Sequence, residues 1–188
     1  LQVLADDRLT PRGQKIARLG TDPRHGAMLI AANTPDEIAT AAKLVAILEE
    51  PPRGANTDLS VAFSRHQPHW QRRSQQLIKR LNQRAGAEDS DLLPGLLACA
   101  FADRIARRRG QEGRYQLANG MGVMLDSDDA LGRHEWLIAP LLLQGSHTPD
   151  ARILQALALD IDALVAAHPE LLRQSDSVEW DDVQGTLK

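Results

Sequence analysis

Aromatic residues and cysteine are both scarce in this chain of 188 residues. Aromatic side chains make up only 3% of the residues, and the one cysteine, Cys99, has no second cysteine to pair with. An internal disulfide is therefore impossible, which excludes a small secreted scaffold held together by disulfides.

Long apolar runs are absent as well. The longest, Leu137 to Leu143, is interrupted by Pro140 and is far shorter than the roughly 18 residues that a membrane span needs. No basic segment followed by an apolar core begins the chain, so we expect no signal peptide. The composition is that of an ordinary globular protein, and we expect a soluble, cytoplasmic protein with no membrane partner. Because the chain begins with Leu1, we expect a piece of a longer protein.

Motifs for catalysis and for metal binding are also missing. The chain has no P-loop, no Gly-x-Ser-x-Gly, no His-Glu-x-x-His and no Cys-x-x-Cys. His66 and His69 have no carboxylate or cysteine nearby, which favours solvated side chains over a metal site. The segment 126–129 resembles a calcium loop, but Ala130 and Leu137 stand where ligands are needed, so a turn is expected. We therefore expect no catalytic residues, no bound metal and no enzymatic activity in this chain alone.

The formal net charge of −3 hides a strong asymmetry. Residues 65–84 contain six basic side chains and no acidic one, whereas acidic residues exceed basic ones in 150–188. Because recognition depends on local patches, the acidic total does not argue against an anionic partner.

Capping signals predict helices in the first half of the chain. Thr10-Pro11 and Asp22-Pro23 each open a short helix, and Gly20 ends the first one. Such a pair occurs in winged-helix domains and in many unrelated helical hairpins. The segment Thr34 to Glu37 is a complete capping box that opens a longer helix, which ends before Pro51. Residues 51–58 are rich in proline, glycine and asparagine and read as a loop.

Two more helices are expected, over 68–84 and 91–104. The first has one narrow apolar face that includes Trp70 and Leu77, and basic residues cover much of the rest. The second is apolar nearly all round, so we expect it to be central.

The second half has the pattern of short strands. Glycine-rich turns separate apolar runs at 114–117, 122–125, 136–143 and 153–159, and 178–187 reads as a terminal hairpin. One helix is expected over 160–172. The sequence therefore predicts an α+β fold, with a helical first half followed by a small β-barrel that has an inserted helix.

Two groups of basic residues are the candidates for binding nucleic acid. Arginines at this density attract phosphates through charge-assisted hydrogen bonds and release counterions from a polynucleotide. Since aromatic side chains are few, we expect contacts mainly to the backbone, with little base preference. A solvated face, or an interface to an acidic neighbouring domain, is the alternative. The candidates are Arg72, Arg73, Lys79, Arg80 and Arg84 on the helical half, and Arg107, Arg108, Arg109 and Arg114 at the entrance to the barrel.

Several segments, in this order, resemble DEAH-box (DEAH/RHA) RNA helicases. The similar segments are Leu9-Thr-Pro-Arg-Gly-Gln-Lys-Ile-Ala-Arg-Leu19, Asp22-Pro-Arg24, Met28-Leu29, Asp103-Arg-Ile-Ala-Arg-Arg-Arg-Gly110, Arg114-Tyr-Gln-Leu-Ala-Asn-Gly120, Glu135-Trp136 and Asp160-Ile-Asp-Ala-Leu164. The triple arginine and the segment after Tyr115 look most like the bacterial HrpB-type subgroup. Gly20 and Thr21 depart from the family, which usually has proline and an apolar residue there.

The resemblance implies the accessory C-terminal region of such a helicase. Residues 1–33 would be the end of a winged-helix domain, 34–109 a ratchet-like helical bundle, and 110–188 an OB-fold-like barrel. The family hydrolyses a nucleoside triphosphate in two RecA-like motor domains and moves 3′ to 5′ along RNA. ATP and Mg²⁺ are therefore expected for the parent protein, with single-stranded RNA (or DNA) and the motor domains as partners. The alternative is a protein-interaction module that docks a partner or the motor domains without touching RNA.

Overall fold

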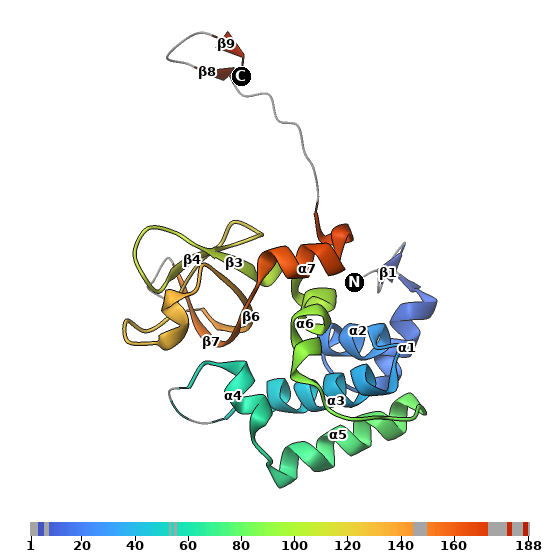
Figure 1. Ribbon diagram of the computed structural model, residues 1–188. Helices are drawn as coiled ribbons and strands as arrows, with labels where there is room; N and C mark the ends of the chain where they lie inside the picture. Colours follow the sequence, from blue (N-terminus) through green and yellow to red (C-terminus); the bar gives the residue numbers. More distant parts are fainter. Residues whose placement is uncertain are drawn as a thin grey trace.

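A computed structural model describes residues 4–5, 8–52, 54, 56–144, 150–172, 180–181 and 186–187. A group of helices leads into a closed barrel of strands (Figure 1). This order confirms the prediction of mixed helices and strands with a barrel in the second half. Among the described helices, none is both long and apolar enough to cross a membrane.

The first three helices begin where their capping residues predict. Thr34 shows why: its hydroxyl accepts a hydrogen bond from the backbone N–H of Glu37, and the Glu37 carboxylate accepts one from the Thr34 N–H. This reciprocal pair satisfies donors that the helix itself leaves unpaired. The bounds are α1 Pro11–Leu19, α2 Pro23–Ala31 and α3 Pro35–Glu49.

Helix α3 is the centre of the helical half. All its residues from Ile38 to Leu48 are buried, and α2, α5 and α6 pack against it. The buried Lys43 is paired with Glu88 at 2.6 Å, which offsets the cost of removing its charge from water. The other helices of this half are α4 Leu59–Ser64, α5 Pro68–Leu81 and α6 Leu93–Phe101.

Three helix predictions need correction. Helix α5 ends at Leu81, because Asn82 takes a left-handed conformation with φ of 53°, so Arg84 lies beyond the helix. The helix expected over 91–104 is α-helical only in α6, between the 3₁₀ turns η1 (Ser90–Leu92) and η2 (Ala102–Arg104). Its central position is confirmed, since Leu93 and Leu97 are fully buried. Helix α4 forms where no element is predicted.

The second half is a closed five-stranded barrel in the order β3-β4-β5-β7-β6. Strands β5 and β7 pair in parallel and the other neighbours are antiparallel. Its interior is filled by side chains such as Tyr115, Val123, Leu137 and Ile153. The strands are β3 Ile105–Arg108, β4 Arg114–Leu117, β5 Gly122–Met124, β6 Trp136–Leu143 and β7 Ala151–Ala158.

The helix expected over 160–172 begins after Asp160 as predicted, but it is shorter and follows the last strand of the barrel instead of being inserted in it. Helix α7 (Ile161–Ala167) follows β7 and packs on α6, so among the described residues it does not separate two barrel strands. It stops at His168, and a 3₁₀ turn, η4 (Pro169–Leu171), follows, because Pro169 cannot continue the hydrogen bonding. Between β5 and β6 the chain forms the 3₁₀ turn η3 (Ala130–Arg133).

A loop of the helical half completes the barrel wall. The backbone N–H of Ala156 on β7 donates to the carbonyl of Thr57 at 2.9 Å, and Asp58 forms a parallel bridge with Ala156. On β7, strand β5 pairs only with Ala151 and Arg152, and this loop is the neighbour of the later residue Ala156.

Two short hairpins lie near the ends of the chain. Strands β1 (Leu4–Ala5) and β2 (Arg8–Leu9) form one, and β8 (Trp180–Asp181) and β9 (Thr186–Leu187) form the other. The terminal hairpin predicted over 178–187 is confirmed, but its two strands form a sheet of their own, although the prediction had placed it in the barrel domain. The division into three domains stays a prediction, as do their winged-helix and ratchet-like identities. The barrel already begins at Ile105, before the predicted boundary at 110.

Candidate nucleic-acid interface

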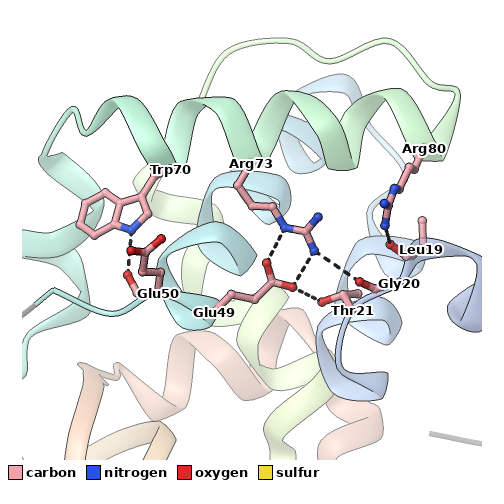
Figure 2. A network of polar contacts seen from close by, with 8 residues as sticks. All are labelled: Leu19, Gly20, Thr21, Glu49, Glu50, Trp70, Arg73 and Arg80. Atoms are coloured by element: carbon pink, nitrogen blue, oxygen red, sulfur yellow. Dashed lines mark hydrogen bonds and ion pairs between the residues drawn. The ribbon is translucent and has the colours of Figure 1, made fainter.

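The basic residues on and after α5 divide into two groups. Arg73 is held by contacts within the chain (Figure 2): its Nε donates to Oε2 of Glu49 at 2.5 Å, and its Nη2 donates to Oε1 at 2.9 Å. Nη2 also lies 3.5 Å from the carbonyl oxygen of Gly20. Thr21 donates its hydroxyl to the same Glu49 carboxylate. Arg73 therefore joins α5 to the end of α3 and to the turn between α1 and α2.

Arg80 is used in a similar way. Its Nη1 donates to the carbonyl oxygen of Leu19 at 2.5 Å, at the C-terminal end of α1, where carbonyls lack helical partners. By contrast, the exposed side chains of Arg72, Lys79 and Arg84 form no ion pair with any residue that the structure describes. The basic surface of this region is thus smaller than the sequence predicts.

Strand β3 presents Arg107 on the outside of the barrel. Its neighbour Ala106 points inward and is fully buried, whereas Arg107 is exposed and lies opposite Gln116 on β4 and Trp136 on β6. The guanidinium carbon of Arg107 is 5.3 Å from the centroid of the Trp136 ring. Its Nε and Nη2 each lie 3.2 Å from Oε1 of Glu135.

A buried carboxylate anchors two further arginines. Asp150 is only 6% exposed. Its Oδ1 and Oδ2 lie 3.0 and 3.2 Å from Nη2 of Arg109, and its Oδ2 lies 3.6 Å from Nη1 of Arg114. Gly122 makes room for this pair, because a Cβ there would lie 2.0 Å from Oδ1 of Asp150 and 2.7 Å from Nη2 of Arg109. Each guanidinium has five N–H donors and about half of each side chain is exposed, so donors remain for a further anion.

Three of the four predicted barrel arginines line one groove of about 770 Å³. Arg108 is half-buried, and its Nη1 donates to the carbonyl of Arg133 at 3.0 Å. Arg114 lies next to the groove, tied to Arg109 through Asp150. The lining residues are Ile105, Arg107, Arg108, Arg109, Gln116, Leu117, Ala118, Glu135 and Trp136.

The two predicted basic groups do not form one continuous surface. In Figure 1, α5 lies on the opposite side of α3 and α4 from strands β3 and β4. The structure thus brings the barrel arginines together and leaves the α5 residues on a separate face.

Sequence reasoning missed the carboxylates that organise these arginines. Asp150 stands 41 positions after Arg109 and Glu135 stands 28 after Arg107, so no local pattern relates them. Trp136 had a signal, since it belongs to one of the segments quoted for the helicase resemblance, but its place beside Arg107 depends on strand pairing.

The groups considered for metal binding do not form a site in the described part of the chain. No cluster of three or more histidine, cysteine or acidic side chains has the geometry to hold an ion there. The turn predicted at 126–129 is confirmed, because the Asp129 carboxylate accepts from the N–H of Leu131 and caps η3.

Comparison with known proteins shows a sequence and a structure similar to those of this chain. Over all 188 residues the chain is 70% identical to the ATP-dependent RNA helicase HrpB of Escherichia coli (strain K12). The resemblance to HrpB-type helicases is confirmed. The chain spans 23% of that HrpB protein. No protein-family model matches the chain.

Solved structures of HrpB agree with the fold. A crystal structure of the E. coli DExH-box NTPase HrpB superposes on the whole chain with a TM-score of 0.93 at 70% identity, and the chain covers 23% of it. A crystal structure of the Escherichia coli DEAH/RHA helicase HrpB gives a TM-score of 0.89 at 64% identity, again with 23% of its chain covered.

Proposed function

We propose that this chain is an accessory nucleic-acid-binding segment of an ATP-dependent RNA helicase. In this proposal the groove on the barrel holds single-stranded RNA by contacts to its backbone. The segment couples that RNA to RecA-like motor domains elsewhere in the parent protein, which move 3′ to 5′. The observation that carries the proposal is the convergence of Arg107, Arg108 and Arg109 at one groove, with Arg114 beside it, in a chain 70% identical to part of an RNA helicase.

The anchoring of Arg109 and Arg114 by Asp150 supports phosphate binding. Two arginines share one buried carboxylate, so their combined charge stays positive after pairing. The anchor also limits the rotamer freedom that each side chain would lose on binding, which favours affinity. Since the sequence has no P-loop, ATP and Mg²⁺ belong to the motor domains in this proposal.

Binding of a labelled single-stranded oligouridylate to the full-length parent protein tests the proposal. The barrel variant carries Arg109→Gln, Arg114→Gln and Asp150→Asn, so that the buried carboxylate is removed together with the two arginines that pair with it. Its affinity should fall, and the slope of log K against log salt should become shallower by about 1.4, the value for two lost contacts to a single strand. The matched variant Arg72→Gln/Arg84→Gln measures the contribution of the separate α5 surface.

Unchanged affinity and slope in the barrel variant would refute RNA binding by this groove. Reduced ATP hydrolysis without a change in RNA affinity would favour the alternative, in which the segment docks on the motor domains or on a partner protein.

A further inference from the structure

The groove contains an exposed cation held over an aromatic ring. Arg107 and Trp136 face each other across the β3–β6 pair, and the guanidinium carbon lies 5.3 Å from the ring centroid. The indole also packs against the hydrophobic cluster of the helical half, which fixes its position. The Arg107 side chain itself is 65% exposed. The arrangement therefore offers solvent a planar, cationic surface backed by a fixed ring.

Arg107 differs from the other barrel arginines in how its hydrogen-bond donors are used. Nε and Nη2 both point to Oε1 of Glu135, whose side chain is 56% exposed at the rim of the same groove. A phosphate that approached this edge would meet the negative charge of Glu135 and compete with it for the same donors. The face of the guanidinium is not used in this way, and guanidinium planes stack on aromatic rings and on bases.

The rest of the groove suits a flat and partly apolar group. Ile105 and Ala118 provide apolar walls, and Gln116 lies opposite Arg107 with its amide nitrogen donating to the carbonyl of Gly120 at 3.3 Å. Ligand pockets that combine apolar walls with a few polar groups hold planar organic ligands, and a volume of about 770 Å³ lies within their usual range.

We propose that this groove binds one unpaired nucleobase, which stacks on the guanidinium of Arg107 above Trp136. This inference rests on the proposed RNA-binding function and goes beyond it, because it assigns a base contact to a site that the sequence predicts to touch only the backbone. Arg109 and Arg114 hold the adjoining phosphates, and Arg107 holds the base.

An abasic scan of a single-stranded RNA in the full-length parent protein tests this assignment. Each position of a labelled oligouridylate is replaced in turn by a ribose without a base. One position should weaken binding about 5- to 150-fold, the range for one stacked base. The variant Arg107→Lys keeps the charge but loses the planar group, so it should bind the intact RNA more weakly by a similar factor and should no longer respond to base removal at that position. Trp136→Phe should also weaken RNA binding and the response to base removal, but by less than Arg107→Lys does.

Two further variants separate stacking from phosphate binding. Glu135→Gln removes the carboxylate that would compete with a phosphate for Arg107. If Arg107 contacts a phosphate, this variant should bind RNA markedly more tightly; if Arg107 stacks on a base, it should not. Arg65→Lys makes the same substitution at an exposed arginine outside the groove, and it should leave both affinity and abasic profile unchanged.

The outcomes distinguish this inference from the proposed function. If Arg107→Lys retains the wild-type affinity and abasic profile while the Arg109/Arg114/Asp150 variant binds weakly, base stacking is refuted and backbone binding stands. If neither variant changes RNA binding, both proposals fail. If every abasic position is tolerated by the wild-type protein, the base contact is refuted whatever the variants do.

Discussion

The contacts of Arg73 predict a measurable loss of stability when that side chain is shortened to an uncharged one. Arg73→Met keeps much of the aliphatic chain and removes the paired hydrogen bonds to Glu49. Arg72→Met is the matched control, because Arg72 is the preceding residue of α5, is exposed and has no ion-pair partner among the described residues. The comparison isolates the pairing from the general loss of one positive charge on the helix.

The geometry sets the size of the expected effect. The side chains of Arg73 and Glu49 are 25% and 24% exposed, and two hydrogen bonds join them. Exposed ion pairs contribute about 0.2–1 kcal/mol, and hydrogen bonds to charged groups about 1.5–3 kcal/mol. For this mostly covered pair we expect Arg73→Met to reduce the free energy of unfolding by about 1–2 kcal/mol. Arg72→Met should stay within about 0.5 kcal/mol of the wild type.

The effect should depend on pH with a defined sign. Burial raises the pKa of the Glu49 carboxyl, whereas the hydrogen bonds from Arg73 and Thr21 lower it. The lowering outweighs the effect of burial, so the pKa of Glu49 lies below its ordinary value. A carboxyl with a lowered folded-state pKa contributes stability above its unfolded pKa of about 4.3 and loses it as the pH falls through the folded value. The difference between wild type and Arg73→Met should be complete at neutral pH and should shrink in acid.

Urea unfolding of the 188-residue chain, followed by tryptophan fluorescence and circular dichroism, measures these differences, and coincident transitions verify two-state behaviour. A double-mutant cycle with Glu49→Gln gives the coupling energy of the pair. Equal losses from the Arg72 and Arg73 variants, or zero coupling between Arg73 and Glu49, would refute the reasoning.

Two further predictions concern the barrel and the helical core. Tyr115→Phe removes a buried hydroxyl that lies 2.7 Å from the carbonyl of His134 and 3.0 Å from that of Leu131, and should destabilise the chain by about 1–3 kcal/mol in urea unfolding. Burial raises the pKa of Tyr115 to about 12 from 10.0, so ultraviolet titration of this single tyrosine should find it ionising at a higher pH than a free tyrosine. The free energy of unfolding should fall between these two pH values, because the unfolded state releases the tyrosine proton first. Leu97→Ala, at a fully buried position of α6, should lower the free energy of unfolding by about 2–5 kcal/mol. Cys99→Ala, on the exposed side of α6, should leave it nearly unchanged. Equal effects of the two variants in thermal unfolding would contradict the described packing.

The elements that the sequence predicted well are those with local signals. The capping box at Thr34 and the proline at each early helix start depend on residues within four positions of one another, so they can be read directly. Strand β6 also matches its prediction, because an eight-residue apolar run next to turn signals is typical of a buried strand.

The missed strand β3 lacks such a signal. Strand β3 contains two of three consecutive arginines, and only Ala106 is buried in it, so charge conceals the alternation of a strand. The early end of α7 was readable from Pro169, whose ring disfavours a helical conformation in the preceding residue.

The candidate site could be predicted only in part, for a related reason. Clusters of arginine are visible in the sequence, but the partners that engage them are distant. Glu49 comes 24 positions before Arg73, and Asp150 comes 41 after Arg109. Only the tertiary fold decides that Arg73 holds two helices together, whereas Arg109 stays at the rim of a groove.

The contacts between the helices and the barrel have a mechanical consequence. Arg24 on α2 pairs with Asp103 in η2, the turn that leads into β3, through two hydrogen bonds of 2.6 and 3.0 Å, and it also donates to the carbonyl of Ala100 in α6. On the other flank, Thr57 bonds to β7 and Asn56 accepts from Gln155 at 3.1 Å. The first attachment holds the turn before β3 and the second holds β7, so a pivot of the barrel about either one would strain the contacts at the other. A rotation of the helices would therefore tend to carry the arginines of the groove with it.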